Sequence, residues 1–203
     1  MNMRSLKVKD QILRAANEIF QAKGLHGSRM QEIADLAEVN KSLIHYYFKN
    51  KQTLYEMVFN NVFYIVAPQI DDIINDESTI EDKIRRFSSN YFAFKQKHPH
   101  LSNFVIHELN ENGDFFDSLK THPKFPNIEK FKIQVEREIR AGILIPINPE
   151  QLFIHILSLN IFPCMAEPFI RGLTNSDPNT YKSILKTRKT EVADFIINSI
   201  KRK

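Results

Sequence analysis

The residues from Lys41 to Phe48 carry the side chains of this chain that are best suited to contact a nucleic acid. Ile44 and Phe48 lie four positions apart, so they share one face of a helix and can pack inward. The other side chains of this short segment are then left on its surface: Lys41, Ser42, Leu43, His45, Tyr46 and Tyr47. Such a helix suits the major groove of DNA, where polar tips contact phosphates and first-turn residues reach base edges. The alternative is that Tyr46 and Tyr47 close a small core.

Lys51 is a second candidate for contact with a phosphate. It follows Asn50, a favourable helix-capping residue, and so lies in the first turn of the next helix. A cation is unfavourable there for the helix dipole, but a phosphate would meet both the ammonium and the free backbone N–H groups of that turn. The alternative is a solvated lysine.

Catalytic and metal-binding chemistry finds little support in the sequence. The one cysteine, Cys164, follows a proline in an apolar segment and is expected to act as a small hydrophobic residue rather than a nucleophile. His98 and His100 flank a proline, His107 adjoins Glu108, and no such pair repeats at metal-ligand spacing. There is no glycine-rich phosphate-binding loop. We therefore expect no enzyme, no metal and no cofactor.

Three short helices would position the candidate DNA contacts. Apolar residues from Lys7 to Lys23 recur at helical spacing, and Gly24 should end that helix before a loop over residues 25–27. Ser28, with Gln31 three residues later, predicts the cap of a second helix. Asn40 predicts the cap of a third helix that ends near Phe48. Two short helices joined by a tight turn form a helix-turn-helix.

The rest of the chain also has a helical pattern, which predicts an all-α fold. A helix from Lys51 to Ala67 continues without glycine until Pro68 kinks or interrupts it. Further helices are expected near residues 79–97, 99–110, 125–141, 150–166 and 179–200. We expect residues 1–50 to form the DNA-binding domain, and residues 51–203 to form a larger domain joined to it by the continuous helix.

Charge is distributed unevenly along the 203 residues. The formal net charge is +4, and the segment through Tyr55, with nine Lys or Arg against five acidic residues, carries all of that excess. A basic segment on a neutral remainder is consistent with a domain that binds a polyanion. A single cysteine and the lack of a signal-peptide pattern predict a cytoplasmic protein. Residues 152–165 are apolar, but this stretch is too short for a membrane span of about 20 residues.

An ordered set of positions near the N-terminus resembles the signature of the TetR family of regulators. The set comprises Gly24, the segments 30–34 and 39–48, Lys51 and Leu54. The resemblance implies an all-helical homodimer whose N-terminal domains bind a palindromic operator in double-stranded DNA. It places the DNA-binding residues at Ser28, Arg29, Lys41, Ser42, Leu43, His45, Tyr46, Tyr47 and Lys51.

Some positions depart from the family pattern. Ser28 and Arg29 stand where two threonines are usual, so the helix cap can shift by one residue and Arg29 can add a phosphate contact. Glu38 replaces the turn glycine, which would cost on the order of 1 kcal/mol in a left-handed conformation. Leu43 cannot hydrogen-bond to a base, so it would contact a thymine methyl group or no base at all.

The resemblance also implies a small-molecule effector and an interface between two copies of the chain. TetR-like proteins bind effectors among their middle helices, and six residues could line such an apolar pocket: Phe87, Tyr91, Phe94, Phe104, His107 and Phe162. The alternative for each is ordinary core. The last two helices would form a four-helix dimer interface through Leu157, Ile161, Val192, Phe195 and Ile196.

Two functions remain open at this point. The first is a transcriptional repressor that a small apolar or aromatic effector releases from its operator. The second is a helical adaptor that has lost specific DNA binding, because Glu38 and Leu43 change the element that would contact bases. An adaptor would not show the steep loss of DNA affinity with salt that phosphate contacts cause.

Overall fold

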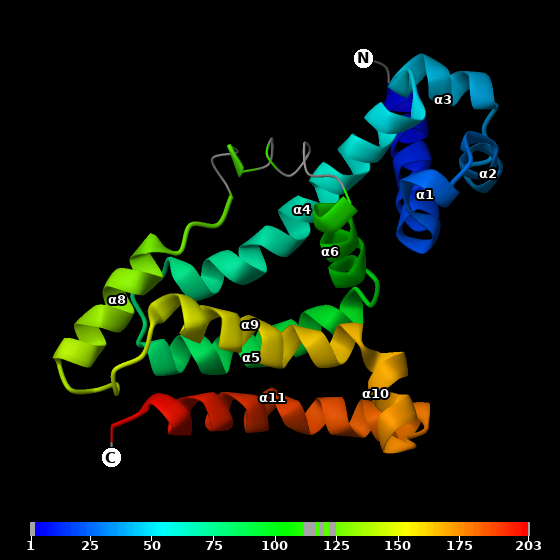
Figure 1. Cartoon of the computed structure of the whole chain (residues 1–203). Helices are drawn as coiled ribbons and strands as arrows, with labels where there is room; N and C mark the ends of the chain where they lie inside the picture. Colours follow the sequence, from blue (N-terminus) through cyan, green and yellow to red (C-terminus); the bar gives the residue numbers. More distant parts are fainter. Residues whose placement is uncertain (1–2, 112–116, 118–119, 122–124, 203) are drawn as a thin grey trace. The chain divides into compact units, whose positions relative to one another are not determined.

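The structure of the chain is a computed structural model that describes residues 3–111, 117, 120–121 and 125–202. These residues form ten helices, and no strand occurs among them (Figure 1). The all-α fold is therefore confirmed. Contacts divide the chain into two compact units, the first comprising Met1–Ile65 with Asn103–Asn112 and the second Val66–Ser102 with Gly113–Lys203. The first unit extends past residue 50, where the sequence places the domain boundary.

The first unit contains α1 (Met3–Gly27), α2 (Met30–Leu36), α3 (Lys41–Phe48), the first part of α4 (Lys51–Ile74) and most of α6 (Leu101–Glu111). Gly24 breaks the regular helix, as predicted, because its φ of +66° lies in the left-handed region that glycine adopts without a Cβ clash. The expected loop at residues 25–27 is wrong, since those residues form a further helical turn at the end of α1.

Aromatic residues dominate the core of this unit. The ring of Phe20 meets that of Tyr55 edge to face at 4.8 Å, and Tyr55 in turn contacts Phe104 at 5.7 Å. The hydroxyl of Tyr55 donates a hydrogen bond to the buried carboxylate of Glu108. Burial and this hydrogen bond both raise the pKa of Tyr55. Residues of α6 therefore complete the core of the first three helices.

Helix α4 does not end at Pro68. It runs to Ile74, with its residues up to Ile65 in the first unit and the remainder in the second. The prediction of a continuous helix from Lys51 is confirmed, and its end lies further along the chain than Ala67.

The second unit contains α5 (Ile80–Lys97), α8 (Glu129–Arg140), α9 (Pro149–Met165), α10 (Glu167–Thr174) and α11 (Pro178–Ile200). Side chains of Thr79, Asn148 and Asp177 accept hydrogen bonds from first-turn N–H groups of α5, α9 and α11, which fixes where these helices begin. Helix α10 was not predicted.

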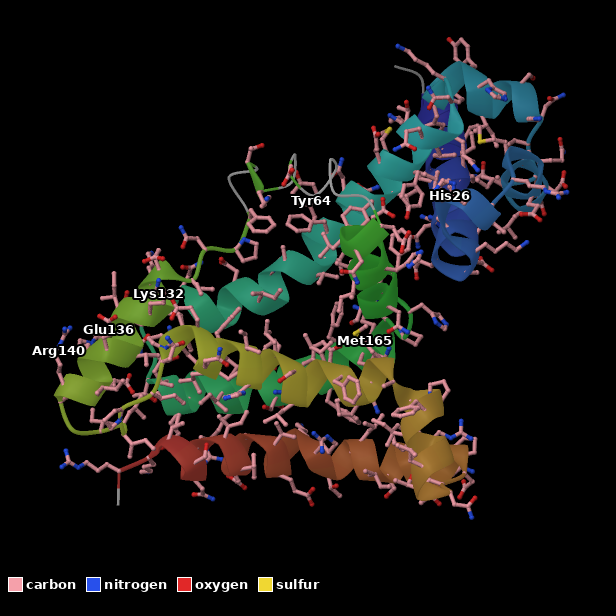
Figure 2. All side chains as sticks on the ribbon, in the orientation of Figure 1. His26, Tyr64, Lys132, Glu136, Arg140 and Met165 are labelled. Atoms are coloured by element: carbon pink, nitrogen blue, oxygen red, sulfur yellow. The ribbon has the colours of Figure 1, made fainter. Side chains whose placement is uncertain are left out.

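Helices α5, α9 and α11 lie side by side and form the core of the second unit (Figure 1). Its buried apolar side chains include Ile84, Phe87, Leu152, Ile156, Tyr181, Val192 and Ile196. Helix α8 packs on α9 through Phe131, whose ring lies 5.6 Å from that of Phe153. Lys132, Glu136 and Arg140 follow one another along α8 at four-residue spacing (Figure 2).

Helices α9 and α10 follow one another with a break at Ala166. No described helix is by itself long and apolar enough to cross a membrane, and these two meet the length and composition required only together, with a bend of 77° between them.

Candidate nucleic-acid interface

The turn between α2 and α3 is held by backbone hydrogen bonds and by a left-handed residue. Glu38 has a φ of +53°, as the sequence predicts for the position of the turn glycine. The N–H of Val39 donates to the carbonyl of Ala34 at 3.0 Å, which closes the end of α2. The side-chain oxygen of Asn40 then accepts from the N–H of Ser42 at 3.0 Å, so the predicted cap of α3 is confirmed.

The two faces of α3 divide as the residue spacing predicts. Ile44 and Phe48 are buried, with exposed fractions of 0% and 1%. Lys41, Ser42 and His45 are exposed, while Leu43 and Tyr47 are half-buried. Tyr46 is 78% exposed and its ring stands edge to face with that of Tyr47 at 5.1 Å. Tyr46 therefore does not close a core, and α3 presents a polar and aromatic surface.

The C-terminal end of α3 holds His45 in a fixed orientation. Lys49 takes a φ of +61°, and its carbonyl oxygen lies 3.0 Å from Nδ1 of His45. The imidazole therefore donates from Nδ1, which leaves Nε2 for another partner. Lys49 itself is exposed and adds a cation beside α3 that the sequence pattern does not indicate.

A lysine of α1 also lies close to α3. The ammonium of Lys9 stands 5.9 Å from the centre of the Phe48 ring. No spacing pattern in the sequence connects residues 9 and 48. The contact between Lys9 and Phe48 is therefore visible only in the folded structure. Lys23, in contrast, forms an ion pair with Glu32 at 2.9 Å, which lowers the pKa of that carboxyl and compensates the charge of Lys23.

At the start of α2 the cap is shifted by one residue from Ser28, as the departure from the family pattern at Ser28 and Arg29 allows. The cap is Arg29, whose N–H donates to the carboxylate of Glu32 at 3.3 Å. Ser28 is only 3% exposed, and its hydroxyl donates to the carbonyl of Leu25 at 2.9 Å. Its side chain therefore supports the link between α1 and α2, while Arg29 is exposed and free to meet a phosphate.

Lys51 has structural partners in addition to any DNA contact. Its ammonium donates to the carbonyl of Leu25 at 2.7 Å and to that of Ser28 at 3.1 Å. These carbonyls belong to the same link between α1 and α2, so the lysine fastens the start of α4 to it. The phosphate contact expected at this residue stays a prediction.

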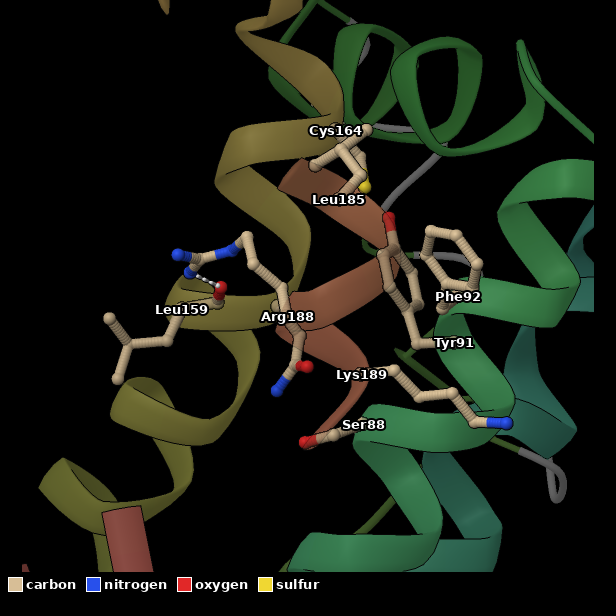
Figure 3. Close-up of a pocket in the computed structure, with 9 residues that line it drawn as sticks. Ser88, Tyr91, Phe92, Leu159, Cys164, Leu185, Arg188 and Lys189 are labelled. Atoms are coloured by element: carbon tan, nitrogen blue, oxygen red, sulfur yellow. Dashed lines mark hydrogen bonds between the residues drawn. The ribbon is translucent and has the colours of Figure 1, made fainter. Parts of the chain in front are cut away.

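The six residues expected to line an effector pocket are divided between the two units. Phe104 and His107 belong to the first unit, whereas the other four belong to the second. Phe87 and Phe94 are core residues, and Phe162 is 55% exposed. Tyr91 does line a cavity of the second unit, shown in Figure 3, but the other residues that line it are not among the six. A helical pattern identifies apolar faces but does not tell which of them border a cavity.

The residues expected at a dimer interface are partly buried inside the second unit and partly at its surface. Val192 and Ile196 are 5% and 2% exposed, because this face of α11 packs inside the second unit. They are therefore corrected to core residues. Phe195, next to Ile196, is 65% exposed, and Leu157 and Ile161 on α9 are half-buried.

Comparisons with known proteins agree with this arrangement. Residues 12–58 match the family model described as bacterial regulatory proteins of the tetR family. The HTH-type transcriptional regulator RutR of Escherichia coli is 26% identical over 148 residues, which cover 73% of this chain and 69% of RutR. The HTH-type transcriptional repressor NicS of Pseudomonas putida is 26% identical over 107 residues, 53% of this chain and 50% of NicS.

The fold is shared over the whole chain as well. The crystal structure of a TetR family transcription regulator from Marinobacter aquaeolei superposes with a TM-score of 0.65, at 15% identity, and covers 100% of both chains. Residues 12–58 therefore carry the DNA-binding domain of the tetR family of bacterial regulatory proteins, and over most of its length the chain is similar to DNA-binding regulators.

Proposed function

We propose that the protein is a repressor that binds a palindromic operator as a homodimer and is released by a small effector molecule. The observation that supports this most strongly is the surface of α3, where Lys41, Ser42, His45 and the 78% exposed Tyr46 stand clear of the core. A recognition helix must leave such side chains free to meet base edges and phosphates.

The proposed contacts fall into two groups. Arg29, Lys41, Lys49 and Lys51 supply charge to phosphates, which gives affinity for every sequence. Leu43, His45 and Tyr46 lie where a recognition helix meets bases, and Leu43 would favour a thymine methyl group. Tyr47 completes this surface beside Tyr46.

Dimerisation is proposed on the exposed apolar side chains of the second unit. Ile154 and Phe162 on α9 are 51% and 55% exposed, and Ile184 and Phe195 on α11 are 41% and 65% exposed. Large apolar side chains on the last long helices suit a four-helix interface between two copies. Such a dimer would have to hold its recognition helices about 34–36 Å apart, one turn of B-DNA.

Release is proposed to use α4, which begins next to α3 and continues as one helix into the second unit. A ligand that changes the packing of the second unit would thereby act on the position of α3. The name of NicS, a transcriptional repressor, supports the direction of regulation.

Selection of bound duplexes from a random DNA pool tests this function. We expect enrichment of a palindrome with half-sites about one helical turn apart. Enrichment of a single half-site would contradict the dimer, and no enrichment would favour an adaptor that no longer binds specific DNA.

A further inference from the structure

A small cavity lies among α5, α9 and α11 in the second unit (Figure 3). Its volume is about 20 Å³, enough for roughly one water-sized group. Ser88 lies at one end and Cys164 with Leu185 at the other, while Arg188 donates to the carbonyl of Leu159 at 2.7 Å. Ser88 is 1% exposed, and among the described residues its hydroxyl has no hydrogen-bond partner.

A larger groove adjoins this cavity. Its volume is about 470 Å³, within the range of roughly 300–1,000 Å³ that is usual for small-molecule sites. The cavity and the groove share Phe92, Cys164 and Leu185, so they meet at the Cys164 end. Lys95, Gln96, Pro99, Glu167 and Lys182 complete the lining of the groove.

The charges around this joined space are mostly positive. Four cations line it, Lys95, Lys182, Arg188 and Lys189, against one carboxylate. That carboxylate, Glu167, lies 3.7 Å from Arg171, which is not part of the lining. None of the four cations has a carboxylate within ion-pair distance in the described part of the chain.

The environment of Lys95 disfavours its charged form. Its ammonium donates to the carbonyl of Pro99, and burial lowers its pKa from the usual lysine value. A partly desolvated cation of this kind gains from an anion that enters beside it, because the attraction is stronger away from bulk water.

We propose that the groove binds a small carboxylic acid with an aliphatic or aromatic body, its carboxylate on Lys95 and Lys182 and its body against Phe92, Leu185 and Cys164. This inference rests on the proposed function, in which the acid would be the effector. A phosphate compound fits less well, because Phe92, Leu185 and Cys164 give the groove an apolar part and no glycine-rich loop in the sequence offers backbone N–H groups.

Calorimetric titration with two pairs of probes tests the preference for carboxylates. Decanoate is compared with decan-1-ol, and 4-butylbenzoate with 4-butylbenzyl alcohol. At least one acid should bind about tenfold or more tightly than its alcohol, since each hydrogen bond to a charged group contributes at this level. Equal affinity within both pairs would overturn the proposal.

Variants locate the carboxylate. Lys95→Gln should weaken binding of the acid about tenfold and leave the alcohol unchanged. The matched control is Lys97→Gln, two residues along the same helix, because Lys97 is exposed and does not line the groove. Thermal unfolding confirms that each variant folds. An unchanged affinity in Lys95→Gln, or an equal loss in both variants, would contradict the placement.

The one cysteine of the chain offers an independent test of where the acid binds. Cys164 lines the groove, so alkylation by iodoacetamide reports on this site alone. Burial raises the pKa of its thiol, which makes the reaction slow and easily followed at mildly alkaline pH. Acid at about ten times its Kd should slow alkylation about tenfold, because only the unoccupied fraction of the protein reacts. An unchanged rate would overturn binding in this groove.

Operator binding, measured with and without the acid, separates this inference from the proposed function. If the acid binds and the operator affinity changes, both stand. If it binds while the operator affinity stays constant, the site stands and its role as effector site fails. If the protein binds the acid but no DNA, the proposed function fails and the site remains.

Discussion

Several side chains have roles that depend on neighbours distant in sequence. Lys51 donates to two carbonyls between α1 and α2, so it has a structural role whether or not DNA is bound. Ser28 is buried in the same link, and Ser88 is buried without a partner in the described structure. At the scale of single residues, stability measurements therefore separate structural from binding roles.

Lys51→Ala should destabilise the protein in the absence of DNA. Two hydrogen bonds from a charged donor are lost, and we expect the free energy of unfolding to fall by about 1–2 kcal/mol. Urea denaturation provides the measurement. Lys41→Ala is the control, because Lys41 is exposed and should change DNA affinity while the stability stays within about 0.5 kcal/mol. Equal stability of both variants would mean that the Lys51 hydrogen bonds contribute nothing.

Ser88→Ala should stabilise the free protein. The change removes a buried hydroxyl that has no described partner and introduces a better helix former, so a gain of about 1 kcal/mol is expected. Ser89→Ala, at the next and half-buried position of α5, reports the helix-propensity effect alone. If the thermal midpoint rose no more in Ser88→Ala than in Ser89→Ala, the hydroxyl would have a compensating partner.

At the scale of elements, the turn before α3 contains a residue in an unfavourable conformation. Glu38 has a φ of +53°, which costs a residue with a Cβ on the order of 1 kcal/mol. Glu38→Gly should therefore raise the free energy of unfolding by up to about 1 kcal/mol. Glu38→Ala retains the Cβ and should give no such gain. Urea denaturation of the two variants gives the midpoints to compare. A gain in stability from alanine equal to that from glycine would show that the left-handed conformation of residue 38 carries no such cost.

Local sequence signals predicted most of the helices. The predictions that failed concern burial and capping that depend on contacts with distant segments. Asn40, Thr79 and Asn148 mark helix starts because a side chain caps its own first turn. Val192 and Phe195 lie on one apolar helix, yet α5 and α9 bury only the first, and the helix sequence alone does not contain that information. The cap at Arg29 likewise depends on Ser28 being drawn into the link after α1.

The candidate DNA surface was more predictable than the candidate effector site. The exposure of Lys41, Ser42, His45 and Tyr46 on α3 could be predicted from the four-residue spacing of the buried Ile44 and Phe48. The groove beside Lys95 joins residues of α5, α9, α10 and α11, and α10 itself was missed. A site built from four helices needs their packing before its lining can be named.

At the scale of the whole molecule, the proposed assembly depends on exposed apolar residues of the second unit. Phe195→Asp should abolish the dimer and operator binding together while the monomer stays folded, because the side chain is 65% exposed. Light scattering measures the mass and circular dichroism the fold. Ile196→Asp is the contrasting change, since a charge at this 2% exposed position should unfold the second unit. A Phe195→Asp protein that remained dimeric would place the interface elsewhere.

The central claim is that this chain contacts the phosphates and bases of duplex DNA through α3 and the residues around it. The most direct measurement is the affinity for the selected duplex as a function of salt, for the unchanged protein and for Tyr46→Ala. Affinity should fall at least about a hundredfold between roughly 50 and 200 mM salt as counterions are released. Tyr46→Ala should weaken binding with the protein's stability unchanged. An affinity that hardly varies with salt, or that Tyr46→Ala leaves intact, would contradict the account.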